Sequence, residues 1–147
     1  MKRFMMACIC LFAIHCYALA DDDKRIDYNQ LPEQARQFIE QHFSSGDIEH
    51  VMEDSEWGGL DKSYEVHFTN GTHIEFDSSG EWEDIKCKYS HVPDEVVPQP
   101  ILNYVNQHHP SNKIVRLDKG FRKYEAKLDN GRELVFDLNF KFRKYDD

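Results

Sequence analysis

Two short stretches of the sequence place a glutamate and a histidine two positions apart, Glu65 with His67 and His73 with Glu75. Imidazole nitrogens and carboxylate oxygens bind divalent cations such as zinc. Residues two apart on a β-strand point to the same side of a sheet, so an antiparallel hairpin would gather these side chains on one face. The sequence therefore offers a candidate metal site of His67, His73 and Glu75, although no sequence-local motif such as His-Glu-x-x-His accompanies it.

The loop between the two stretches decides which side chains share a face. Apolar and polar residues alternate on both sides of Asn70-Gly71, which is typical of an antiparallel hairpin. A two-residue turn would put Phe68 and Ile74 on opposite faces and leave neither face apolar. A three-residue loop with a left-handed Gly71 instead pairs Val66 with Ile74 and gathers the apolar residues on one face. We therefore predict the three-residue loop.

This register opposes polar residues on the other face, with β-carbons about 4.5–5.5 Å apart. His67 is expected to oppose His73, and Glu65 to oppose Glu75. A similar loop at Ser78-Ser79-Gly80 would make Glu75 face Glu83. The candidate binding residues on this polar face, from both halves of the chain, are Glu65, His67, His73, Glu75, Glu83, Lys127, Lys141 and Arg143.

The polar residues of the first half are acidic with histidine, whereas those of the second half are mixed to basic. Three interpretations are open. In the first, the face is polar only because it is exposed to solvent. In the second, it binds another envelope or secreted protein, and in the third it holds a divalent cation.

No catalytic site is predicted. The sequence contains no nucleophile elbow, phosphate-binding glycine loop or paired cysteine motif. Its carboxylates are expected to be exposed, whereas acid–base catalysts are usually buried groups with shifted pKa values. We therefore expect a protein that is not an enzyme and needs no cofactor.

An internal match appears when the sequence is shifted by 60 residues. Tyr64 then meets Tyr124, Asn70-Gly71 meets Asn130-Gly131, and Phe76-Asp77 meets Phe136-Asp137. Length differences fall near loops and helix starts, where a duplicated unit tolerates them. The interpretation is two tandem copies at 31–90 and 91–147, preceded by a tail at 21–30.

Each copy is predicted to begin with a helix and continue as antiparallel strands. Pro32 suits a first helical turn, and apolar residues follow it at helical spacing as far as Phe43. The second helix is expected to begin near Pro98 or Pro100 and to end at Pro110. Strands at 48–52 and 114–117 precede the hairpins. The fold class is therefore α+β, with the helices on one face of one antiparallel sheet.

The first 20 residues have the pattern of a secretory signal peptide. Lys2 and Arg3 precede a short apolar stretch, and a small-x-small site ends at Ala20. The stretch is too short to span a bilayer comfortably. We predict cleavage after Ala20, a periplasmic or secreted product, and no membrane span thereafter.

The predicted mature chain is acidic and has one cysteine. Loss of Lys2 and Arg3 leaves 16 basic residues against 27 acidic ones, so the net charge changes from −9 to −11. Nucleic acid is therefore excluded as a partner class. Cys87 is the cysteine that remains, and we expect it to be a small buried residue.

The pattern resembles the PepSY-like family, also called β-lactamase-inhibitor-like. The residues that carry this resemblance lie at about 31–145, and they are Leu31-Pro32, Tyr64-x-Val66-x-Phe68, Asn70-Gly71 and Glu75-Phe76-Asp77-x-x-Gly80-x-Trp82. The second copy departs from it by placing Asn139-Phe140 where the first has Ser79-Gly80. Its last turn is therefore expected to differ.

The resemblance implies a curved antiparallel sheet with helices on one side and the other side open. In the β-lactamase inhibitor that gives the family its second name, the open side grips an enzyme. The expected function is a non-enzymatic protein-binding or inhibitor-like module. The alternative is a divalent-cation-binding or envelope-sensing protein that uses the histidines and glutamates of the polar face.

Overall fold

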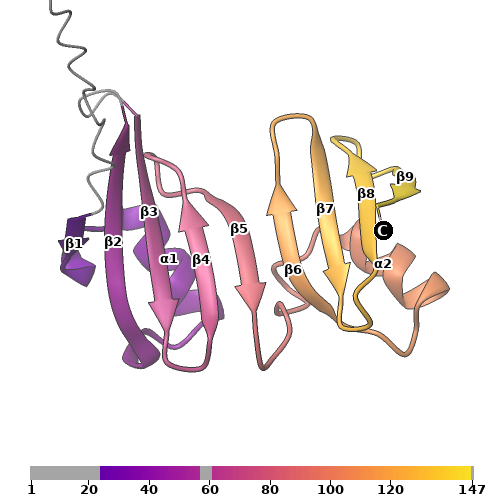
Figure 1. Cartoon of the computed structure of the whole chain (residues 1–147), viewed down its shortest axis with the longest axis horizontal. Helices are drawn as coiled ribbons and strands as arrows, with labels where there is room; N and C mark the ends of the chain where they lie inside the picture. The colour runs from indigo at the N-terminus through magenta and orange to yellow at the C-terminus, as the bar shows by residue number, and fades with distance from the viewer. Residues whose placement is uncertain (1–23, 57–60, 147) are drawn as a thin grey trace, which may run out of the picture.

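The structure is a computed structural model that describes residues 24–56 and 61–146. Within these residues the chain forms one open antiparallel sheet of nine strands with two α-helices, so the predicted α+β class is confirmed (Figure 1). Each strand pairs with its neighbours in the sequence, in the order β1 to β9. Such local pairing needs only hairpins and short helical connections.

The strands and helices of the described residues have the following bounds. The strands are β1 (Lys24–Ile26), β2 (Ile48–Glu56), β3 (Asp61–Phe68), β4 (Thr72–Phe76), β5 (Trp82–Cys87), β6 (Ile114–Lys119), β7 (Lys123–Leu128), β8 (Glu133–Asp137) and β9 (Phe142–Tyr145). The helices are α1 (Glu33–His42) and α2 (Gln99–His108), and short 3-10 turns occur at η1 (Tyr28–Gln30) and η2 (Ser45–Asp47).

The predicted signal peptide, residues 1–20, lies outside the described residues. The predicted tail at 21–30 is described from residue 24 onward, where it forms β1 and η1. β1 pairs with β2 through Ile26 and Val51, and both of these side chains are buried. This segment therefore contributes an edge strand to the sheet.

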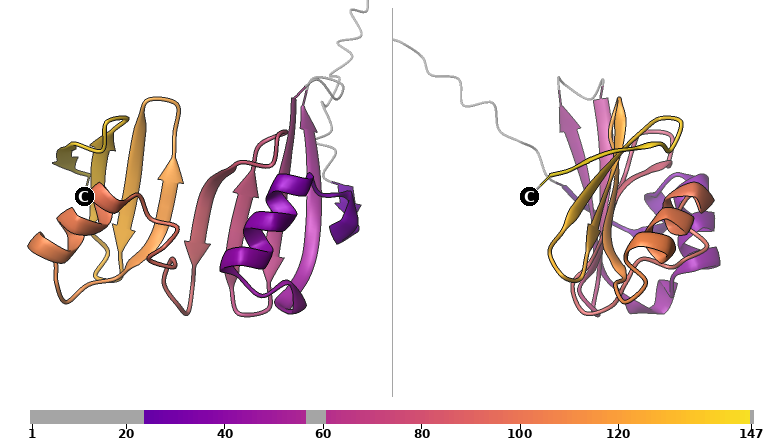
Figure 2. Two further views of the ribbon diagram at one scale, coloured as in Figure 1. Left: turned by 180° about the vertical axis from the view of Figure 1, so that it is seen from behind. Right: turned by 90° about the vertical axis from the view of Figure 1, so that its right-hand side faces the viewer.

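Helix α1 begins after Pro32, as predicted, and buries one side against the strands of the first half. Ala35 and Ile39 are fully buried, and the ring of Phe38 meets Phe76 of β4 edge-on at 5.9 Å between centroids. In the view from behind the sheet, α1 lies over these strands (Figure 2). The alternation of β3 and β4 therefore has a definite buried side, which we call the core face.

Helix α2 makes comparable contacts in the second half. It begins after Pro98 and buries Ile101 and Val105. Tyr104 meets Phe136 of β8 edge-on at 5.5 Å and stacks on Phe142 of β9 at 4.6 Å. Neither helix among the described residues is long and apolar enough to cross a membrane.

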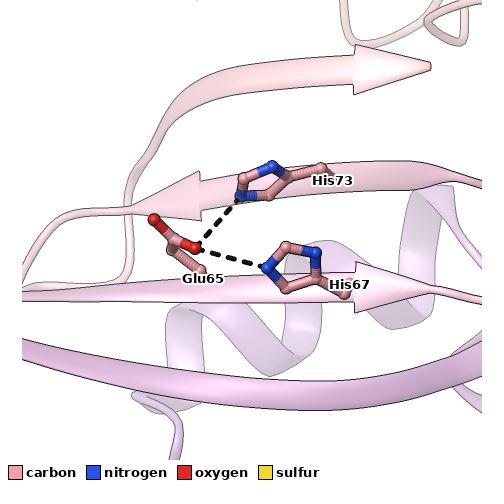
Figure 3. A group of neighbouring side chains, drawn as sticks. All are labelled: Glu65, His67 and His73. Atoms are coloured by element: carbon pink, nitrogen blue, oxygen red, sulfur yellow. Dashed lines mark hydrogen bonds and ion pairs between the residues drawn. The ribbon is translucent and has the colours of Figure 1, made fainter. Parts of the chain in front are cut away.

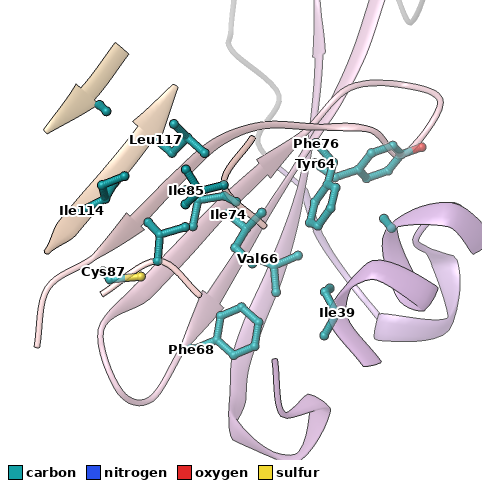
Figure 4. Packing of buried hydrophobic residues seen from close by; sticks show 14 of the residues in the cluster. Ile39, Tyr64, Val66, Phe68, Ile74, Phe76, Ile85, Cys87, Ile114 and Leu117 are labelled. Atoms are coloured by element: carbon teal, nitrogen blue, oxygen red, sulfur yellow. The ribbon is translucent and has the colours of Figure 1, made fainter. Parts of the chain in front are cut away.

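One apolar core runs along the sheet from β1 to β8. In the first half it consists of large side chains that alternate along β3 and β4, and it continues through Ile85 of β5 to Leu117 of β6 (Figure 4). These two residues oppose each other where β5 pairs with β6. The two halves therefore share one buried layer across the middle of the sheet.

Left-handed residues end four of the hairpin loops, as predicted for Gly71. Gly71 has φ of 77°, and its N–H donates to the Phe68 carbonyl at 3.0 Å. The predicted register follows, because Val66 pairs with Ile74 and Tyr64 with Phe76. Gly80 and Gly131 have φ of 89° and 87° and occupy the same position in their loops.

The expectation that the last turn differs is wrong. Phe140 adopts φ of 60°, and its N–H donates to the Asp137 carbonyl at 2.9 Å, as Gly80 does to Asp77. The Asp137 carboxylate accepts hydrogen bonds from two backbone N–H groups of the loop at 2.9 and 3.0 Å. The Phe140 ring also packs against Tyr124 at 5.1 Å. These contacts offset the cost of a left-handed phenylalanine.

Alanine substitutions at two of the loop glycines should separate backbone strain from steric clash. A Cβ at Gly80 would lie 2.8 Å from the Ala35 backbone nitrogen, whereas a Cβ at Gly131 meets nothing within 4 Å. Gly131→Ala should lower the free energy of unfolding by about 1 kcal/mol. Gly80→Ala should lower it by about 3 kcal/mol, because overpacking adds to the strain. Urea unfolding measures both; equal losses would contradict the close contact at Gly80.

Candidate functional site

The candidate residues of the first half lie on the side of β3 and β4 opposite the core face, which we call the polar face. Val66 and Ile74 are fully buried on the core face. The residues between them in sequence therefore point the other way. His67 opposes His73 and Glu65 opposes Glu75, both as predicted.

Glu65, His67 and His73 converge in what we call the His–Glu cluster (Figure 3). One carboxylate oxygen, Glu65 Oε2, lies 3.3 Å from His67 Nε2 and 3.6 Å from His73 Nε2. One ligand atom from each residue lies within 4.8 Å of the other two. The three side chains are partly exposed, at 22 to 41%. The cluster is thus open to solvent on one side.

A third histidine, His50, adds to the cluster and was missed by the sequence reasoning. His50 pairs with His67 across β2 and β3, and their rings stack at 4.3 Å between centroids. The rings of His67 and His73 stack at 4.2 Å. The sequence did predict a strand at 48–52, but a bulge between Ile48 and His50 sets its pairing with β3.

Glu75, the carboxylate of the predicted metal site, lies next to the cluster. Its Oε1 atom is 3.8 Å from His73 Nε2 and 3.6 Å from Lys86 Nζ. Because Lys86 attracts this carboxylate, Glu65 and not Glu75 completes the compact set of three ligand atoms. Both glutamates had suitable register positions, and the position of Lys86 distinguishes them.

The predicted pairing of Glu75 with Glu83 is wrong. Glu75 pairs with Asp84, because a bulge in β5 adds a residue before the expected pair of Phe76 with Trp82. Glu83 instead lines a cavity of about 260 Å³ together with Asp54, Asp61, Lys62, Ser63 and Asp77. The bulge places Trp82 and Ile85, three residues apart, on the core face, whereas the prediction for Glu83 assumed strict alternation along this strand.

Asp84 is the most buried acid of the polar face and joins the two halves. Its side chain is 5% exposed. The Arg116 guanidinium on β6 donates two hydrogen bonds to it, at 2.9 and 3.1 Å, and Lys86 Nζ lies 2.9 Å away. A bidentate pair of this kind is both strong and directional. It stabilises the boundary between β5 and β6.

The second half of the polar face carries pairs of opposite charge. Lys127 contacts Glu133 at 2.8 Å, and Arg143 contacts Asp137 at 2.6 Å. The side chain of Lys141 is exposed. These three predicted residues are spread over β7, β9 and the loop between β8 and β9, and the structure does not gather them into one cluster.

Burial and crowding shift several pKa values on the polar face. Burial lowers the pKa of His73, and the neighbouring His67 lowers it further. Burial raises the pKa of Glu75, and Asp84 raises it further against the opposite effect of Lys86. Burial also raises the pKa of Glu83, with Asp77 adding to the effect. Folding therefore favours the neutral forms of His73, Glu75 and Glu83.

Cys87 is buried, as the sequence predicted. Burial raises the pKa of its thiol. A thiol of this kind is a poor nucleophile, because the thiolate is the reactive species.

Comparison with known proteins identifies the family. The family model described as "putative beta-lactamase-inhibitor-like, PepSY-like" matches residues 62–144, from β3 to β9. The chain belongs to the PepSY-like family. No match was found among the curated proteins.

Several solved structures resemble this PepSY-like chain over most of its length. A periplasmic protein of the DUF2874 family from Bacteroides vulgatus is 43% identical, with a TM-score of 0.82, and the match covers 87% of this chain and 99% of that one. A protein from Bacteroides thetaiotaomicron, described as calcium-regulated and periplasmic, is 42% identical, with a TM-score of 0.81 and coverage of 86% and 98%. A second periplasmic protein from Bacteroides vulgatus, of unknown function, is 34% identical, with a TM-score of 0.78 and coverage of 85% and 99%. The PepSY-like chain is a periplasmic or secreted protein, as predicted.

The lowered pKa of His73 predicts a loss of stability in mild acid. Folding favours the neutral ring, so this contribution is fully present above the ordinary pKa of 6.5 and is lost as pH falls toward the lower pKa of the folded state. His73→Asn should weaken the fall in the free energy of unfolding between pH 7.5 and pH 5. Urea unfolding across this range is the measurement. An identical pH profile in the variant and the wild type would contradict the assigned shift.

Proposed function

We propose that this PepSY-like chain is a non-enzymatic binding protein whose polar face docks a protein partner. The observation that carries the proposal is the crowding of carboxylates in the first half: burial raises the pKa values of Glu75 and Glu83, and neighbouring acids, Asp84 and Asp77 respectively, raise them further. A basic surface on a partner would relieve this repulsion, and opposite charges steer two proteins toward each other. The proposed partner surface is therefore basic.

We further propose that the polar face belongs to two tandem units, residues 31–90 and 91–147, with both helices on the core face. Equivalent contacts support this arrangement. Phe38 of α1 meets Phe76, and Tyr104 of α2 meets Phe136, at positions 60 residues apart on the strands. The loops ending at Gly71 and Gly131 have the same backbone geometry. The side view in Figure 2 is in keeping with a sheet that is left open on the polar face.

The two units would then share a buried side and differ in their exposed sides. In the first unit, acids and histidines crowd together on the polar face. In the second, Lys127 with Glu133 and Arg143 with Asp137 neutralise each other. Docking is therefore proposed on the first unit, with the second unit extending the contact. The inhibitor-like description of the family suggests an enzyme as the kind of partner to test first.

Reversal of three charges on the first unit should weaken docking. The variant Glu65→Lys, Glu75→Lys, Glu83→Lys is compared with Glu33→Lys, Glu40→Lys, Asp94→Lys, which changes the net charge equally at exposed positions in α1 and before α2. A partner captured from an envelope extract is purified, and its Kd is measured against both variants. We expect the first variant to bind the partner at least about tenfold more weakly than the control variant does. The affinity of the wild type for the partner should fall as salt is added. Equal binding by both variants would remove the polar face as the docking surface.

A second candidate function is a response to divalent cations. The observation that favours it is the convergence of ligand atoms in the His–Glu cluster. The similar protein from Bacteroides thetaiotaomicron is described as calcium-regulated, which supports testing cations in general. In this candidate function a bound cation changes the charge of the polar face.

A further inference from the structure

We propose that Glu65, His67 and His73 form a site for one transition-metal dication of the zinc class. This inference rests on the second candidate function and adds the ligand atoms and the class of metal. The ligand atoms are His67 Nε2, His73 Nε2 and Glu65 Oε2. The proposed site lies on the polar face, where β3 and β4 pair.

The spacing of the ligand atoms fits a tetrahedral metal. Zinc binds nitrogen and oxygen at about 2.0–2.2 Å, so two tetrahedral ligand atoms lie about 3.3–3.6 Å apart. Glu65 Oε2 lies 3.3 Å from one imidazole nitrogen and 3.6 Å from the other. Two of the three pairs of ligand atoms therefore already have this spacing, and the third pair lies within 4.8 Å, so we propose that side-chain rotations complete the site.

The kinds of ligand select the metal class. Two imidazoles and one carboxylate suit zinc, copper, nickel and related ions. Calcium takes six to eight oxygen ligands, which two imidazoles do not supply. The proposed site should therefore discriminate strongly against calcium, whatever the response of the Bacteroides thetaiotaomicron protein.

The His73 nitrogen is already shielded from solvent and points into the cluster. His73 Nε2 has no hydrogen-bond partner among the described residues, and its nearest carboxylate oxygen is Glu65 Oε2 at 3.6 Å. A shielded polar atom without a partner carries a desolvation cost. Coordination to a metal would satisfy this atom directly.

Stacked rings and paired strands hold the ligands in place. His67 is held between His50 and His73, with ring centroids 4.3 and 4.2 Å away. His50 thus acts as a positioning residue for His67. Three protein ligands leave a fourth position open to water, as in zinc sites that exchange ligands. Lys86, which contacts Glu75, keeps that second carboxylate out of the set.

The binding experiment uses metal ions alone. The purified chain is freed of metal with a chelator and titrated with Zn²⁺, then separately with Ca²⁺, by calorimetry. Co²⁺ reports the coordination geometry through its visible absorption. We expect one Zn²⁺ per chain with Kd below about 1 mM, a tetrahedral Co²⁺ spectrum, and a higher Tm in the presence of Zn²⁺ because the metal binds the folded state.

Single substitutions assign the ligands. Glu65→Gln, His67→Asn and His73→Asn should each weaken Zn²⁺ binding at least about tenfold. A matched control, His91→Asn at an exposed position, should leave the Kd within about threefold, and Glu75→Gln beside the cluster should weaken binding less than Glu65→Gln does. His50→Asn should weaken binding less than loss of a ligand. Urea unfolding of each variant confirms that it is folded.

The results distinguish failure of the proposed zinc site from failure of the proposed response to divalent cations. No Zn²⁺ binding, or Zn²⁺ binding unaffected by the three ligand variants, would overturn the proposed site. Ca²⁺ binding that survives His67→Asn and His73→Asn, with no Zn²⁺ binding, would overturn it while leaving a cation response intact. If neither Zn²⁺ nor Ca²⁺ binds, both the proposed zinc site and the proposed cation response are wrong. If Glu75→Gln loses as much Zn²⁺ affinity as Glu65→Gln, the assignment of Glu65 as the carboxylate ligand is wrong.

Discussion

The backbone angle at the last residue of four hairpin loops controls the rest of the structure. Positive φ at Gly71, Gly80, Gly131 and Phe140 closes loops of the same kind. A shift of one residue in any of them would move the apolar side chains of a strand to the wrong face. With this register, Val66 and Ile74 enter the core, and His67 and His73 meet on the opposite side. The same strand register therefore determines both the core and the candidate site.

Asp84 adds a second constraint, at the boundary between the two halves. Only three residue pairs join β5 to β6. Across this short ladder, Ile85 and Leu117 are fully buried on the core face, while Asp84 binds Arg116 on the polar face. Burying a carboxylate is costly unless it is paired and hydrogen-bonded. The fully satisfied Asp84 thus allows one continuous sheet in which the acidic first half adjoins the charge-paired second half.

The sequence predicted the elements and the main hairpin register, because alternation and turn glycines are strong local signals. Three features had no such signal. The bulge that sets Asp84 opposite Glu75 breaks the alternation of β5, because Trp82 is followed on the core face by Ile85. The left-handed Phe140 depends on its contact with Tyr124 and on hydrogen bonds to Asp137. The choice of Glu65 over Glu75 depends on Lys86, which lies on another strand. Each is a tertiary effect.

We propose that the hairpin register builds a cation site from cross-strand neighbours. Anomalous X-ray scattering at the zinc edge, from crystals soaked in Zn²⁺, tests this claim most directly. The account predicts one peak on the polar face, about 2.0–2.2 Å from His67 Nε2, His73 Nε2 and Glu65 Oε2. A zinc peak elsewhere on the chain, or an empty cluster at full zinc occupancy of other sites, would contradict it.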